Sequence, residues 1–141
     1  LPIDGADAEL AMRLVAGTPD YMAPEQLGGV CEVRTDVFGL GATLYEILAG
    51  RAPHAWSDGA RPADWRRRVL AARFARPRRW NPQAPKTLEA ICLKALSRDP
   101  QRRQPSAAAL ASELRQCVSI GQVSGANTMF SRAWQRLRQQ R

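Results

Sequence analysis

The segment between Thr35 and Gly50 constrains the fold most, because it is apolar on almost every side of a helix. Apolar residues occur at nearly every position instead of on one stripe: Val37, Phe38, Leu40, Ala42, Leu44, Tyr45, Ile47, Leu48 and Ala49. Thr35 is a suitable N-cap, and Gly50, with Pro53 soon after it, is suited to end the helix. A helix that is apolar all round must be buried all round. The sequence therefore predicts a central helix surrounded by the rest of the domain.

Two glycines lie inside this predicted helix, Gly39 and Gly41. Glycine in a helix interior costs roughly 1 kcal/mol relative to alanine. We expect that both glycines let neighbouring backbone come close to the helix.

Three further helices are expected after this one. Residues 62–75 should form a helix that turns Trp65, Val69, Ala72 and Phe74 inward and its arginines outward. A second helix should end before Asp99-Pro100, and a third should be capped by Ser106. Their inward faces follow helical spacing, with Leu88, Ile91, Cys92, Ala95 and Leu96 in one and Ala107, Leu110, Ala111, Leu114 and Cys117 in the other. No strand signal competes, so the predicted fold class is mainly α.

The chain is long enough for one domain, which we assign to residues 1–118. Residues 119–128 are rich in Gly, Ser, Asn and Gln, which is typical of a linker. Residues 129–141 place Phe130, Trp134 and Leu137 on an apolar stripe among arginines, which predicts a basic amphipathic helix. Such a helix can pack on its own domain, dock a partner or lie on a membrane surface.

Positive charge is concentrated in the second half of the chain, where 17 Lys and Arg face 3 acidic residues, against 4 Arg and 10 acidic residues in positions 1–64. Eight arginines fall between Arg61 and Arg79. This stripe could bind anions or nucleic acid. The simpler interpretation is a solvated helix face in a chain that uses 19 Arg and 2 Lys. No nucleic-acid-binding motif accompanies the charge, so we do not expect nucleic acid as a partner.

The three cysteines, Cys31, Cys92 and Cys117, are too far apart for a Cys-x-x-Cys pair, and His54 is the only histidine. This pattern supports neither a disulfide framework nor a metal site. We expect Cys92 and Cys117 to be core residues of a protein in a reducing cytoplasm, or at the cytoplasmic face of a membrane if the native chain is longer. No run of about 18 apolar residues suggests a membrane span.

The run from Gly17 to Glu25 reads Gly-Thr-Pro-Asp-Tyr-Met-Ala-Pro-Glu, and Thr35 to Gly41 reads Thr-Asp-Val-Phe-Gly-Leu-Gly. Together these runs resemble the end of the activation segment and the following helix of a protein kinase, whose signature includes Ala-Pro-Glu. From about residue 10 to residue 118 the chain resembles the large helical lobe of a bacterial-type serine/threonine protein kinase. The resemblance implies a fold built around a central buried helix.

The resemblance also implies roles for seven residues. Gly17 and Thr18 mark serine/threonine specificity, and Thr18 would hydrogen-bond the catalytic aspartate and lysine. Tyr21 and Met22 would form the pocket for the substrate residue that follows the phosphorylated one. The remaining three are architectural: Glu25 would pair with Arg103 through a bidentate ion pair, and Asp36 would hold the backbone of the catalytic loop.

The residues before Gly17 contain no Gly-rich loop, strand lysine, His-Arg-Asp or Asp-Phe-Gly, and the chain begins with Leu1 instead of Met. We therefore expect a fragment that lacks the small lobe and the catalytic loop. The complete kinase would use ATP and Mg²⁺ to phosphorylate Ser or Thr of a protein substrate. The chain alone is expected to contain no catalytic or metal-binding residue, to bind no ATP and to be marginally stable. The alternative is a non-catalytic module that binds a peptide or partner.

Overall fold

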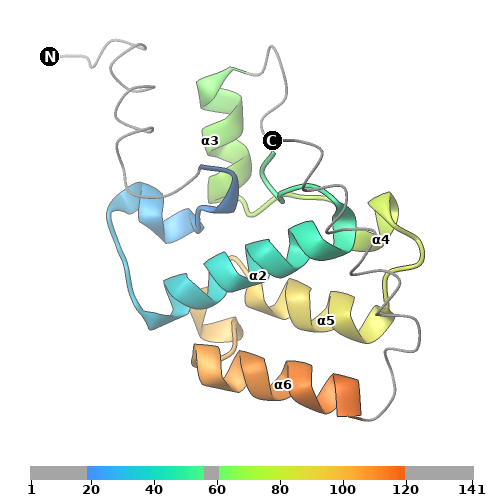
Figure 1. The fold of residues 1–141 in the computed structure, drawn as a ribbon. Helices are drawn as coiled ribbons and strands as arrows, with labels where there is room; N and C mark the ends of the chain where they lie inside the picture. Colours follow the sequence, from blue (N-terminus) through green and yellow to red (C-terminus); the bar gives the residue numbers. More distant parts are fainter. Residues whose placement is uncertain (1–18, 56–60, 120–141) are drawn as a thin grey trace, which may run out of the picture.

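The computed structural model describes residues 19–55 and 61–119. Every regular element in these two ranges is a helix, which confirms the mainly α fold class (Figure 1). None of these helices is long and apolar enough to cross a bilayer. In chain order the elements are η1 (Pro19–Tyr21), η2 (Pro24–Gly28), α2 (Val33–Ala49), α3 (Pro62–Leu70), α4 (Pro77–Trp80), α5 (Lys86–Ala95), η3 (Pro100–Arg102) and α6 (Ala107–Ser119).

Helix α2 is the centre of the fold, as predicted. It contacts α4, α5, α6, η1 and η3, and Figure 1 shows α2, α5 and α6 stacked beside one another. Its side chains at Phe38, Tyr45 and Leu48 are at most 1% exposed. These large side chains join residues of α5 and α6 in the main core, which includes Leu88, Cys92, Leu96 and Cys117. Burial on several faces explains why the α2 sequence lacks an amphipathic pattern.

One stripe of α2 remains open, contrary to the expectation of burial all round. Asp36, Leu40 and Thr43 lie one helical turn apart and are exposed. Leu40 is 46% exposed, an unusual position for a leucine in the middle of an otherwise buried helix. The described residues therefore cover every side of α2 except this stripe.

The ends of α2 differ in how well the sequence predicts them. The helix begins two residues before Thr35, and Glu32 holds the N-cap position. Thr35 instead lies in the first turn, where its hydroxyl accepts a hydrogen bond from the Glu32 backbone N–H at 3.1 Å. At the other end Gly50 adopts φ 76°, and its N–H bonds to Glu46 O at 2.7 Å. The prediction of the C-terminal stop is confirmed, and the prediction of Thr35 as N-cap is wrong.

The two glycines of α2 have different surroundings. A Cβ built on Gly41 would lie 2.7 Å from the Ala95 Cβ, so α5 can approach α2 here only because Gly41 has no side chain. A Cβ on Gly39 would meet no heavy atom within 4 Å. Close approach is therefore confirmed at Gly41, and at Gly39 no described residue makes one.

Helix α3 is shorter than the sequence predicts, because it ends at Leu70 instead of near residue 75. Ala72 adopts φ 46°, a left-handed conformation that is uncommon for a residue other than glycine and reverses the chain. The turn returns Phe74 to the core, where its ring meets Tyr45 and His54 at 5.7 Å between centroids. The chain therefore turns back and packs Phe74 into the core at the place where the sequence predicts a last helical turn.

Helices α5 and α6 lie where the sequence predicts them. The Ser106 hydroxyl accepts a hydrogen bond from the Ala109 N–H at 3.1 Å, which confirms the predicted cap. Leu110 and Cys117 are buried, as predicted. The sequence also predicts that Ala107 faces inward, but it is the first residue of α6 and is exposed. Cys92 is also buried, and burial raises the pKa of its thiol to about 12. Cys92 and Cys117 are free core cysteines, as expected, and Cys31 is exposed.

Candidate functional site

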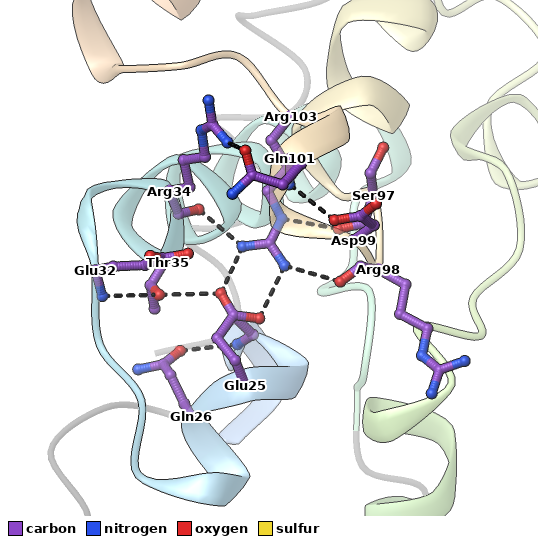
Figure 2. A network of polar contacts seen from close by, with 11 residues as sticks. Glu25, Gln26, Glu32, Arg34, Thr35, Ser97, Arg98, Asp99, Gln101 and Arg103 are labelled. Atoms are coloured by element: carbon purple, nitrogen blue, oxygen red, sulfur yellow. Dashed lines mark hydrogen bonds and ion pairs between the residues drawn. The ribbon is translucent and has the colours of Figure 1, made fainter.

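An ion pair between Glu25 and Arg103 joins the first described segment to the residue that follows η3 (Figure 2). The Arg103 Nη1 donates to Glu25 Oε1 at 2.6 Å, and Nη2 donates to Oε2 at 2.8 Å. The Arg103 side chain is fully buried and that of Glu25 is 13% exposed. Because both oxygens and both terminal nitrogens take part, the pair fixes the orientation of the two side chains as well as their distance.

Backbone carbonyl groups satisfy the remaining donors of Arg103. Its Nε donates to Ser97 O at 2.8 Å, Nη1 also donates to Arg34 O at 2.8 Å, and Nη2 also donates to Arg98 O at 3.3 Å. All five N–H groups of the guanidinium therefore have an acceptor. The guanidinium carbon also lies 4.9 Å from the centre of the Phe38 ring. One arginine thus connects α2, the segment around η2 and the loop before η3.

Side chains of the first segment and of α2 complete this network. The Thr35 hydroxyl donates to Glu25 Oε1 at 2.9 Å, and the Gln26 side chain accepts from the Ala23 N–H at 2.8 Å. Burial by itself would raise the pKa of Glu25, but the hydrogen bonds from Arg103, the backbone and Thr35 together lower it below its ordinary value. Glu25 is therefore held as a carboxylate at neutral pH.

Tyr21 is attached to the central helix by a hydrogen bond from its hydroxyl to Glu46. Burial raises the pKa of Tyr21, and the hydrogen bond to the Glu46 carboxylate raises it further. Glu46 is the only charged residue between Val37 and Ala49. A lone carboxylate in such an apolar run indicates a specific partner. Sequence reasoning assigned no role to Glu46, although that signal was present.

Met22 is 4% exposed and packs against Trp65 and Val69 of α3, with Leu27 at the edge of the cluster. Asp20, two residues earlier, accepts a backbone hydrogen bond from the His54 N–H at 3.3 Å. The segment 19–28 is therefore held between α2 and α3. The helices position it from both sides.

An open groove of about 410 Å³ lies where this segment meets α2. Tyr21, Met22 and Gln26 of the segment line it, together with Gly39 of α2 and with Asp36 and Leu40 of the open stripe. Among the described residues, no hydrogen bond or ion pair involves the Asp36 carboxylate. The structure thus brings Tyr21, Met22 and Asp36 to one groove, and the Glu25–Arg103 pair anchors the same segment to the loop after η3.

Two of the predicted site residues, Gly17 and Thr18, lie outside the described residues, as do residues 1–16, positions 120–128 of the predicted linker and the predicted tail helix at 129–141. Within residues 19–55 and 61–119, no group of three or more His, Cys, Asp or Glu side chains could hold a metal ion.

Comparison with known proteins gives the same family along most of the chain. Residues 5–114 match the family model described as "Protein kinase domain". The chain is 34% identical over 102 residues to the serine/threonine-protein kinase PrkC of Bacillus subtilis, a match that covers 72% of this chain and 15% of PrkC.

Two further relatives carry different specificities in their names. The tyrosine-protein kinase MasK of Myxococcus xanthus is 36% identical over 117 residues, covering 82% of this chain and 18% of MasK. The serine/threonine-protein kinase PknB of Mycolicibacterium smegmatis is 35% identical over 101 residues, covering 71% of this chain and 16% of PknB. The chain thus spans less than a fifth of the length of each of these relatives.

Proposed function

The chain belongs to the protein kinase domain family, and on that premise we propose that residues 1–118 form part of the large lobe of a serine/threonine protein kinase. In this proposal that part of the lobe begins within the activation segment and ends at α6. Its function is to bind and position the protein substrate. Residues outside these 141 would bind the phosphate donor ATP and Mg²⁺. They would also supply the catalytic loop.

The observation that carries the proposal is the buried ion pair between Glu25 and Arg103. Glu25 ends the Ala-Pro-Glu run, so the pair anchors the base of the proposed activation segment to the core. An activation segment has to stay in a fixed position for substrate and catalytic groups to meet, because orientation supplies much of the rate in phosphoryl transfer. A bidentate pair with every guanidinium donor satisfied supplies this fixed position.

Substrate binding is assigned to Gly17, Thr18, Tyr21 and Met22. The bond from Tyr21 to Glu46 and the packing of Met22 on α3 hold these two residues at the groove. They would contact the substrate residue after the phosphorylated one. Thr18 would hydrogen-bond the catalytic aspartate and lysine and so position them against the substrate hydroxyl.

The open stripe of α2 is assigned to the catalytic loop. Asp36 has a carboxylate with free acceptor capacity at the groove, and Leu40 beside it offers apolar surface. A loop laid along this stripe would donate backbone N–H groups to Asp36 and cover Leu40. This arrangement would explain why one side of the most buried helix is left uncovered by the described residues.

In the complete kinase, Mg²⁺ neutralises the phosphate charge of ATP and a catalytic-loop aspartate accepts the proton of the substrate hydroxyl. Residues of this chain would orient the substrate for that step. The chain by itself is proposed to be inactive, because the groups that stabilise the charge of the transferring phosphoryl group are not among its 141 residues.

The test is phosphate transfer by the native polypeptide that contains this chain. It is supplied with Mg²⁺–ATP and with peptides that differ only in a Ser, Thr or Tyr acceptor. Transfer to Ser and Thr peptides is expected, and Thr18→Ala should lower kcat by about 100-fold or more because it loosens the catalytic groups. Thr87→Ala, at a threonine of α5 that does not line the groove, is the matched control and should leave kcat unchanged.

Other outcomes would refute parts of the proposal. Transfer to the Tyr peptide alone would contradict the serine/threonine assignment, a possibility that the similarity to a tyrosine-protein kinase makes worth testing. Absence of transfer to any peptide would favour the alternative, a non-catalytic module that binds a peptide or partner at the Tyr21 and Met22 surface.

A further inference from the structure

A second pocket, separate from the groove of Tyr21 and Met22, lies at the C-terminal end of α2 and has a volume of about 360 Å³. Three arginines from different parts of the chain line it: Arg51 from the loop after α2, Arg68 from α3 and Arg73 from the turn after α3. Trp80 of α4 and Phe74 add aromatic surface. The pocket therefore combines a strong positive charge with an aromatic wall.

Among the described residues, no carboxylate pairs with the three arginines, Arg51, Arg68 and Arg73. Three neighbouring arginines are paired, since Arg61 and Arg67 both pair with Asp64, and Arg76 pairs with Glu89. Like charges gathered in one pocket repel one another. A bound anion would remove this repulsion.

The walls of the pocket are held in place by hydrogen bonds. The Trp80 indole N–H donates to the Tyr45 hydroxyl at 3.1 Å, and that hydroxyl donates to Ala75 O at 2.7 Å. The Arg51 guanidinium lies over the Trp80 ring at 4.5 Å from its centre. A guanidinium stacked on an aromatic face loses little further entropy when it binds an anion. The aromatic wall of the pocket is therefore fixed by contacts within the chain, with Arg51 stacked on it.

The turn after α3 brings Arg73 to the pocket. Ala72 takes its left-handed conformation there, and the Arg73 N–H bonds to Arg68 O at 2.9 Å. This turn reverses the chain so that both arginines line the same space. A helix continued to residue 75, as the sequence suggests, would instead have placed the two arginines about 140° apart around its axis.

We propose that this pocket binds the phosphoryl group of a phosphorylated serine or threonine in a protein segment. A phosphoryl group carries nearly two negative charges and three acceptor oxygens. It is therefore a better ligand for three guanidinium groups than a carboxylate, which has one charge and two oxygens. The volume is at the low end for ligand sites, so it suits a phosphorylated side chain better than a nucleotide. The inference rests on the proposed function for the source of such segments, which a serine/threonine kinase produces.

Binding is tested with a fluorescein-labelled peptide of Gly, Ser and Ala around one phosphoserine, by fluorescence anisotropy on the native polypeptide without ATP. The phosphorylated peptide should bind about tenfold or more tightly than the same peptide without phosphate, and inorganic phosphate should displace it. The double variant Arg68→Gln/Arg73→Gln should weaken binding by about tenfold or more. Arg51→Gln, at the Trp80 ring, should also weaken it.

The matched control is Arg66→Gln/Arg115→Gln, which removes the same charge from exposed positions outside the pocket. It should change the affinity by less than about twofold, because distant surface charges are screened by salt. Equal weakening by both double variants would overturn the proposal and indicate attraction to diffuse charge. Equal binding of a glutamate peptide, or of heparin in preference to the phosphopeptide, would also overturn it.

Failure of this proposal and failure of the proposed function can be distinguished. Binding is measured without phosphate transfer. If the protein binds the phosphopeptide but transfers no phosphate, the proposed pocket stands and the proposed kinase activity is refuted. If the protein transfers phosphate but binds the phosphorylated and unphosphorylated peptides equally, the proposed kinase activity stands and the proposed pocket is refuted.

Discussion

Glu25 and Arg103 are 78 residues apart in sequence and form two parallel hydrogen bonds in the structure. The pair lies at the meeting point of three segments, because Arg103 also bonds to the carbonyl groups of Ser97, Arg34 and Arg98. Loss of either partner would leave the other charge buried without a counterion. The stability of the whole described core should therefore depend on this one contact.

Replacing Arg103 tests this dependence. Arg103→Met should lower the free energy of unfolding by about 3 to 5 kcal/mol, because the Glu25 carboxylate and three carbonyl groups lose their donor. Urea denaturation followed by circular dichroism measures the change. Arg102→Met is the matched control, since Arg102 is exposed, and it should change stability by less than about 0.5 kcal/mol.

The coupling between the two partners is a separate prediction. Glu25→Leu combined with Arg103→Met should cost less than the sum of the two single substitutions, by about 1 to 3 kcal/mol, because the double variant leaves no unpaired buried charge. The measurement is a double-mutant cycle on the urea midpoints. Strict additivity would mean that the two side chains do not interact in solution.

His54 should make stability sensitive to mild acid. Burial, and then the positive charge of Arg68, lowers the pKa of His54 to about 4, and neither ring nitrogen has a partner among the described residues. The unfolded chain takes up a proton near pH 6.5 and the folded chain only near pH 4. Stability is therefore lost as pH falls from about 6.5 to about 4, by on the order of 3 kcal/mol, and this loss is complete below pH 4.

His54→Phe isolates this effect from other titrating groups. The phenylalanine ring keeps the aromatic contacts to Phe38 and Phe74 and has no proton to gain. The stability difference between variant and wild type should therefore grow in favour of the variant as pH falls from about 7.5 to about 4.5. A difference that does not vary with pH would mean that His54 is not buried as a neutral ring.

Gly41 and Gly39 provide a matched pair in one helix. Gly41→Ala should destabilise the protein by about 1 to 3 kcal/mol, because the new Cβ would lie 2.7 Å from Ala95 Cβ and force α2 and α5 apart. Gly39→Ala meets no described atom within 4 Å and should stabilise the chain by about 0.5 to 1 kcal/mol through helix propensity. Thermal denaturation of both variants measures the contrast, and equal effects would contradict the close packing of α5 on α2 at Gly41.

Leu40 tests the open stripe of α2. In the 141-residue chain, Leu40→Gln should reduce binding of a hydrophobic dye and change the free energy of unfolding by less than about 0.5 kcal/mol, because Leu40 is 46% exposed. In the longer kinase that we propose, the same substitution should lower stability, since the proposed catalytic loop would bury this position. Unchanged stability there would argue against a loop on the stripe.

The central helix illustrates how far the sequence predicts the fold. Apolar residues all round 37–49 predict burial, and Gly50 predicts the end, because both signals are local to the segment. The start at Val33 is not predicted, since Glu32 and Thr35 form their capping contact only in the context of the turn. The end of α3 is not predicted either, because packing of Phe74 on Tyr45 and His54, which are distant in sequence, favours a turn over another helical turn.

The candidate site divides in a similar way. The resemblance carried by the Ala-Pro-Glu run implies the pairing of Glu25 with Arg103, and the structure contains that pair. The partner of Tyr21, by contrast, required the structure, because nothing in the spacing of residues 21 and 46 brings a hydroxyl to a carboxylate. The arginine pocket also required the structure, since the sequence indicates a single basic stripe.

By itself the sequence determined the family, the helical class and the burial of the central helix, because these depend on local motifs and on the periodicity of apolar residues. Only the tertiary structure decided which charges are compensated and which are not. Arg67 and Arg68 are adjacent in sequence, yet Arg67 pairs with Asp64 whereas Arg68 lines a pocket with Arg51 and Arg73. Charge pairing acts over a few ångströms in space, so it depends on how the chain folds back on itself.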